Sequence, residues 1–166
     1  VLFRSIAVTG GTDGNRVFAA MNASPLNDAV DWSRAHVWWG DERFVAADDD
    51  DRNAKQAREA WYGALVESGR MPAANIHAMP ADTRGAEEIA AASPEQTDAV
   101  LAEAAAEYQR ELIEQLGENP ALDIAMFGMG PDAHFASLFP DHGEAEIDDR
   151  SEERRVGKSV DLGGRR

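Results

Sequence analysis

Three short loops in this sequence place glycines next to side chains that can do chemistry. They are Thr9–Thr12 (TGGT), Gly40–Arg43 (GDER) and Gly128–His134 (GMGPDAH). Glycines ahead of a helix can expose backbone N–H groups to a phosphate, to which a threonine adds a hydroxyl. An arginine can bind an anion through two donors, and a histidine titrates near neutral pH. These residue types suit a small phosphorylated ligand.

Each loop also has a purely structural interpretation. Gly10-Gly11-Thr12 could be a tight strand-to-helix turn, since it lacks the pattern of a Walker loop or of a GxGxxG dinucleotide turn. Asp41-Glu42-Arg43 could be a surface charge cluster, and His134 could be a core histidine or a helix cap. Taken singly, none of the three loops decides the function.

The sequence offers little for a metal ion. His36, His77 and His142 show no metal-ligand spacing with one another. The four aspartates of Asp48–Asp51 lack the spacing and the glycine of a calcium loop, so we expect a solvated loop. We therefore predict no metal site.

Strands and helices alternate between these loops. Apolar β-branched or aromatic runs predict strands, and apolar residues spaced three or four apart predict helices. Ser93 followed by Pro94 is typical of a helix start, and Gly117 of a helix end. The expected strands are 5–8, 35–39, 75–79 and 122–128, and the expected helices are 15–23, 53–68 and 94–116.

This alternation predicts the fold class. Strands joined by helices form right-handed crossovers and a parallel sheet. We expect a single three-layer α/β/α sandwich with a mostly parallel, Rossmann-like sheet, incomplete at both ends. The three loops follow three of the strands, so they should meet at the carboxyl edge of the sheet, where such folds bind ligands.

Composition excludes several functions. The chain has 166 residues, no cysteine and a net charge of −15. This charge argues against nucleic acid and anionic membranes as partners, and no apolar run has membrane-spanning length. The absence of cysteine fits a cytoplasmic protein.

The two ends differ from the rest of the chain. Residues 1–5 lead abruptly into a strand pattern, and residues 144–166 are rich in charge and lack an apolar period. We expect a non-native leader over 1–5, an α/β domain over 6–143, and a non-native or disordered tail over 144–166.

Three segments together resemble a known family. They are the TGGT loop, residues 31–60 (DWSRAHVWWGDERFVAADDDDRNAKQAREA) and residues 123–141 (DIAMFGMGPDAHFASLFPD). They are similar to 6-phosphogluconolactonases, within the superfamily of sugar-phosphate isomerases and deaminases. The glucosamine-6-phosphate deaminases share the glycine-rich turn, but Gly-Asp-Glu-Arg and Ser-Leu-Phe-Pro favour the lactonases.

The resemblance implies hydrolysis of 6-phospho-D-glucono-1,5-lactone to 6-phospho-D-gluconate, a step of the oxidative pentose phosphate pathway. It implies no metal or organic cofactor, and we expect a monomer or weak homodimer. His134 would be the general base, and Asp132 would orient it or shape its turn. Arg43 would also be catalytic, since it could hold developing negative charge as well as phosphate. The residues implied to bind the substrate or its phosphate are Gly10, Gly11, Thr12, Asp41, Arg43 and Asn53.

The sequence departs from the family pattern near the implied site. Asp13 follows the glycine turn and would bring a carboxylate near a phosphate. Ala133 replaces a glycine, which would strain the turn if that position has a positive φ. Phe135 stands where a smaller residue is usual. A second hypothesis is therefore a catalytically silent sugar-phosphate-binding module, and a third is a deaminase-like enzyme.

Overall fold

The computed structural model describes residues 4–140 of the chain. Its four strands are β1 (Ser5–Val8), β2 (His36–Trp39), β3 (Ile76–His77) and β4 (Ile124–Ala125). Its α-helices are α1 (Gly11–Ala23), α2 (Asn53–Ala57), α3 (Gly63–Glu67), α4 (Ala86–Ala91) and α5 (Pro94–Leu116). A π-helical turn, Arg58–Tyr62, joins α2 to α3, and 3-10 turns cover Pro25–Ala29, Trp32–Arg34 and Ala73–Asn75.

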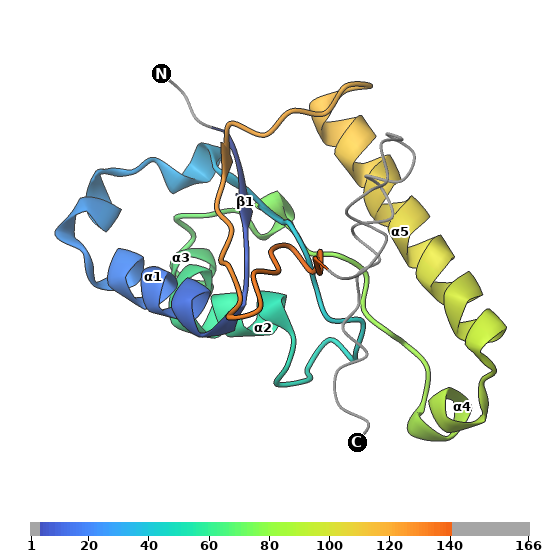
Figure 1. Cartoon of the computed structure of the whole chain (residues 1–166). Coiled ribbons are helices and arrows are strands. Elements are labelled where there is room, and N and C mark those ends of the chain that lie inside the picture. The colour runs from blue at the N-terminus through green and yellow to red at the C-terminus, as the bar shows by residue number, and fades with distance from the viewer. Residues whose placement is uncertain (1–3, 141–166) are drawn as a thin grey trace.

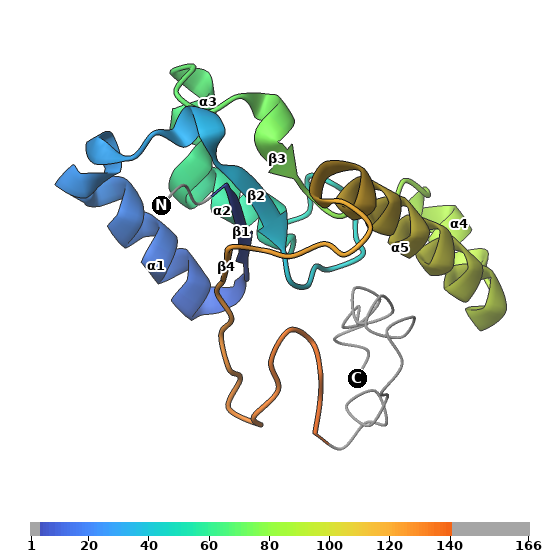
Figure 2. The ribbon, with the colours of Figure 1, turned by 90° about the horizontal axis from the view of Figure 1, so that it is seen from above.

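The strands form one parallel sheet in the order β3-β2-β1-β4. Helices α1, α2 and α3 lie on one side of the sheet and α5 on the other (Figures 1 and 2). The predicted three-layer α/β/α arrangement is therefore confirmed.

Neighbouring residues of β2 bind the two helical layers to the sheet. Trp39 meets Tyr62 of the π-helical turn edge to face, with ring centroids 6.0 Å apart. Trp38 lies against Tyr108 of α5, with centroids 5.9 Å apart. The alternation of side chains along a strand explains why adjacent tryptophans serve opposite faces.

The helix α5 begins and ends where the sequence predicted. Ser93 and Gln96 form a reciprocal capping box with Pro94 at the first helical position, and Gly117 follows the last turn with a φ of 89°. Tyr108 is the one buried residue of α5, while Leu112 and Leu116 are half-buried against the core. The apolar stripe that the spacing of the sequence places on this helix is therefore only partly buried: Leu101, Ala105, Tyr108, Leu112 and Leu116. The helix therefore packs against the core through few side chains.

Several predicted boundaries were wrong by a few residues. The strands expected over 75–79 and 122–128 are only two residues long each, at Ile76–His77 and Ile124–Ala125. The helix expected from Asn15 already begins at Gly11. The helix α4 was not predicted.

The start of the described chain is held against the segment that leads into β4. Ser5 is the first residue of β1, as the predicted strand over 5–8 has it, and it was also counted in the predicted leader over 1–5. The carboxylate of Asp123 accepts hydrogen bonds from the backbone N–H groups of Arg4 and Ser5, at 2.8 and 3.0 Å, and from the Ser5 hydroxyl at 2.9 Å. Asp141, His142 and the expected tail over 144–166 lie outside the described residues.

Candidate functional site

The glycine-rich turn lies directly between β1 and α1. Gly10 is the N-cap of α1 in an extended conformation, and Gly11 has a φ of +78°. Gly11 and Thr12 form the exposed first turn of this 13-residue helix. Their backbone N–H groups are among those that a helix start leaves without intrahelical acceptors, where the helix dipole also favours an anion.

Asp13, which departs from the family pattern, forms an ion pair next to the glycine turn. Asp13 pairs with Arg16 at 3.3 Å, and both side chains are largely exposed. A neighbouring guanidinium therefore offsets the negative charge that the sequence placed beside the glycines.

The second loop brings Asp41, Arg43 and Asn53 together. The Asn53 amide donates to the Asp41 carbonyl at 3.0 Å, and Arg43 Nη1 lies 3.5 Å from Asn53 Oδ1 and 3.6 Å from Asp41 Oδ2. Asn53 also touches the first loop, since a Cβ on Gly10 would lie 1.7 Å from Asn53 Oδ1. The predicted phosphate-binding residues of the first two loops are thus neighbours.

The third loop carries the predicted pair of Asp132 and His134. His134 Nδ1 is hydrogen-bonded to Asp132 Oδ1, and the imidazole stacks on Phe139 with ring centroids 4.6 Å apart. The hydrogen bond from His134 lowers the pKa of Asp132, so the carboxylate is ionised at neutral pH and acts as acceptor. This fixes Nδ1 as the protonated nitrogen of a neutral His134 and leaves Nε2 as its basic nitrogen.

Asp41 joins the third loop to the other two. Its Oδ2 accepts a hydrogen bond from the Ser137 hydroxyl at 2.7 Å, and its Oδ1 accepts one from the Thr9 hydroxyl at 3.4 Å. The expected meeting of three loops at the carboxyl edge of the sheet is therefore observed.

Comparisons with known proteins identify the family of this chain. The family model for glucosamine-6-phosphate isomerases/6-phosphogluconolactonase matches residues 3–159. The chain belongs to this family. It is 41% identical to a 6-phosphogluconolactonase of Streptomyces coelicolor, over 83% of this chain and 49% of that protein. It is 36% identical to a 6-phosphogluconolactonase of Synechocystis, over 88% of this chain and 53% of that protein.

Solved structures of the family have the same fold. The 6-phosphogluconolactonase of Trypanosoma brucei superimposes with a TM-score of 0.63 at 27% identity, over 88% of this chain and 55% of that one. The chain thus spans about half the length of the relatives it matches.

Two buried residues, Glu42 and Arg52, support the second loop, and no sequence pattern predicted their role. Glu42 accepts hydrogen bonds from the backbone N–H groups of Asn53 and Ala54, at 2.7 and 2.9 Å, so it caps α2 from eleven residues upstream. Burial raises the pKa of Glu42, and Arg52, 3.9 Å away, opposes that shift. No local pattern links residues so far apart, so only the fold reveals this cap of α2.

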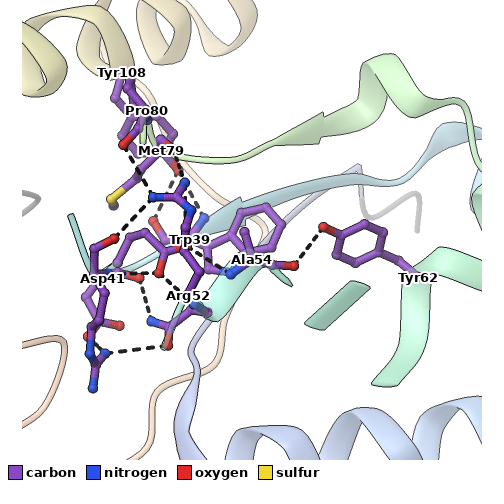
Figure 3. A network of polar contacts seen from close by, with 11 residues as sticks. Trp39, Asp41, Arg52, Ala54, Tyr62, Met79, Pro80 and Tyr108 are labelled. Atoms are coloured by element: carbon purple, nitrogen blue, oxygen red, sulfur yellow. Dashed lines mark hydrogen bonds and ion pairs between the residues drawn. The ribbon is translucent and has the colours of Figure 1, made fainter. Parts of the chain in front are cut away.

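The guanidinium of Arg52 ties this loop to a more distant segment. It donates to the carbonyl of Arg43 at 3.1 Å and to the carbonyls of Met79 and Pro80. Figure 3 shows Arg52 reaching from the start of α2 toward Met79 and Pro80, with Asp41 close by. The buried Arg52 therefore ties the loop that carries Arg43 to the segment after β3.

The remaining described histidines lie elsewhere. His36, at the amino end of β2, is hydrogen-bonded to His77 at 2.8 Å, and His77 to Glu111 of α5 at 2.6 Å. Burial, followed by the neighbouring His77, lowers the pKa of His36. Within residues 4–140 no group of three or more histidine, cysteine, aspartate or glutamate side chains could hold a metal ion. Within the same range, no helix is long and apolar enough to cross a membrane.

Proposed function

We propose that this chain carries the site of a 6-phosphogluconolactonase, which hydrolyses 6-phospho-D-glucono-1,5-lactone to 6-phospho-D-gluconate. The observation that carries the proposal is the position of the Asp41 carboxylate, which contacts Thr9 directly before the glycine turn, Arg43, and Ser137 in the loop of His134. The names of the relatives support the same reaction over the deaminase alternative. The lack of cysteine supports a cytoplasmic location.

The phosphate would bind at the start of α1. The N–H groups of Gly11 and Thr12 and the Thr12 hydroxyl would donate to its oxygens, and the helix dipole would favour its charge. Arg43 would supply the countercharge. Both of its observed contacts use Nη1, so a bidentate contact with phosphate would use Nη2 and Nε.

His134 would act as general base. Its Nε2 would take a proton from a water molecule, whose oxygen forms a bond to the lactone carbonyl carbon. When the tetrahedral intermediate collapses, the bond between that carbon and the ring oxygen breaks, and the imidazolium returns the proton to the departing oxygen. Ionised Asp132 would stabilise the imidazolium and hold the ring in place. Asp41 would hold Arg43, and Asn53 would hold the Gly10 turn beside it.

The test is a lactone-hydrolysis assay on the purified chain, with spontaneous hydrolysis subtracted. We expect His134→Ala to lower kcat by about 100-fold or more while binding of 6-phosphogluconate, measured by calorimetric titration, stays nearly unchanged. Arg43→Lys should mainly raise KM, because a point charge replaces a planar fork. Arg58→Lys is the matched control. Arg58 is an exposed arginine of the π-helical turn, and it pairs with Glu67 of α3.

The outcomes separate the hypotheses. Binding of 6-phosphogluconate without turnover would favour the silent module. Full activity of His134→Ala above the spontaneous rate would refute the general-base role. Absence of both binding and turnover in the unmodified chain would refute the proposed function.

A further inference from the structure

The Asp41 carboxylate is buried where three loops meet. Asp41 is 6% exposed and Ser137 is 5% exposed, and their side chains are joined by the 2.7 Å hydrogen bond. This bond links residues 96 positions apart in the sequence. A hydrogen bond from a hydroxyl to a buried carboxylate is among the stronger kinds in proteins.

The loop around His134 needs such a restraint. Ala133, Ala136 and Ser137 have positive φ values of 65°, 46° and 60°. Each left-handed residue other than glycine costs about 1–2 kcal/mol of conformational energy, so the surroundings must hold this backbone in place.

Two apolar side chains of the same loop are exposed, although Ala136 and Ser137 are buried. Met129 is 76% exposed and Phe135 is 48% exposed. Local contacts shape the turn itself, since Gly130 N–H donates to the His134 carbonyl at 2.8 Å and Phe135 pairs with Leu138. These bonds lie within the loop, and Phe135 also packs edge to face on Phe127 with ring centroids 6.1 Å apart. The Ser137 hydroxyl, in contrast, reaches the loop that follows β2.

We propose that the hydrogen bond between Ser137 and Asp41 is a latch that holds the His134 turn at the carboxyl edge of the sheet. Ser137 and Asp41 are then positioning residues for the reaction proposed above, on which their catalytic consequence rests. Because the same Asp41 oxygen lies 3.6 Å from Arg43 Nη1, one carboxylate sets the places of both the base and the phosphate-side arginine.

Two substitutions separate the hydroxyl from the backbone conformation. Ser137→Ala removes the hydroxyl and keeps the strained φ, whereas Ser137→Gly removes the hydroxyl and relieves the strain. If the latch matters, both variants loosen the loop. If Ser137 serves only the backbone conformation, Ser137→Gly behaves like the unmodified chain or better. Ser33→Ala is the matched control, because it deletes an exposed serine–aspartate hydrogen bond with Asp31.

Hydrogen exchange on the ligand-free chain tests the latch directly. We expect both Ser137 variants to raise amide exchange over residues 128–139 by about 10-fold or more, while exchange in β1 and β2 stays unchanged. Ser33→Ala should leave exchange of this loop unaffected. Unchanged exchange in Ser137→Ala, or protection in Ser137→Gly equal to the unmodified chain, would overturn the latch.

In the lactonase assay, a change in kcat without a change in KM distinguishes a positioning role of Ser137 from a general loss of stability. We expect Ser137→Ala to lower kcat by about 10-fold or more at unchanged KM, assayed well below the melting temperature of the variant, since the base moves and the phosphate site remains. A rise in KM with unchanged kcat would overturn the positioning role. An unmodified chain without activity would refute the proposed function alone, and the exchange experiment would still decide the latch.

Discussion

The side chain of Asn53 fills the space where a Cβ on Gly10 would lie. The ideal Cβ position on Gly10 is 1.7 Å from Asn53 Oδ1 and 2.2 Å from Asn53 Cγ. Asn53 is fully buried and its amide donates to the Asp41 carbonyl, so it cannot move away without losing that bond. The glycine turn and the start of α2 are therefore packed as one unit.

Gly10→Ala should disrupt the packing between the glycine turn and the start of α2. Because the new methyl group would push Asn53 out of its place, we expect a loss of about 1–3 kcal/mol in unfolding free energy, measured by urea denaturation. Calorimetric titration should also show weaker binding of 6-phosphogluconate. Gly85→Ala is the control, since nothing lies within 4 Å of a Cβ at Gly85, and its stability should change little. Equal stability of the two variants would contradict the close approach.

Arg52→Met should destabilise the chain strongly. Glu42 would keep a buried charge without its partner, and the carbonyls of Arg43 and Met79 would lose a donor. We expect urea denaturation to show a loss of about 3–5 kcal/mol at neutral pH. Arg16→Met removes an exposed ion pair and should cost less than about 1 kcal/mol.

The loss caused by Arg52→Met should depend on pH. Burial already raises the pKa of Glu42, and Arg52 is the charge that opposes the rise. Without Arg52 the carboxyl takes up a proton at higher pH, which removes the unpaired charge. The stability difference between the variant and the unmodified chain should therefore be smaller at pH 5 than at pH 8, and a difference independent of pH would contradict this account.

Asp123→Asn should change how stability responds to acid. Hydrogen bonds from the Arg4 and Ser5 backbone lower the pKa of Asp123 in the folded chain. A lowered carboxyl pKa contributes stability that is present above the unfolded pKa and is lost as the pH falls through the folded pKa. Urea denaturation should thus show a deficit for Asp123→Asn at pH 7 that shrinks below about pH 4. Asp28→Asn, which removes an exposed partner of Arg70, controls for the loss of one charge.

Ala133→Gly should stabilise the His134 turn. Ala133 has a φ of +65°, as the replacement of a family glycine suggested, and glycine adopts this conformation without a steric penalty. We expect the unfolding free energy to rise by about 1 kcal/mol, measured by thermal and urea denaturation. Ala102→Gly in the exposed part of α5 should have the opposite sign and cost about 1 kcal/mol. A loss of stability in both variants would contradict the strain at Ala133.

The sequence by itself determined the features that depend on neighbours in the chain. The β1 strand, the capping box of Ser93 and the end of α5 at Leu116 follow from short apolar runs and from cap and stop residues. The meeting of three loops also followed, because parallel strands joined by helices place their carboxyl ends at one edge.

The tertiary structure alone decided which groups support that edge. Glu42 caps a helix eleven residues away, Arg52 binds carbonyls 27 and 28 residues away, and Ser137 binds a carboxylate 96 residues away. It also decided that only Tyr108 of the α5 stripe is buried, since burial depends on where the sheet lies. Such partners are chosen by packing between distant segments, and the local pattern of a sequence carries no information about which distant segment will be in reach.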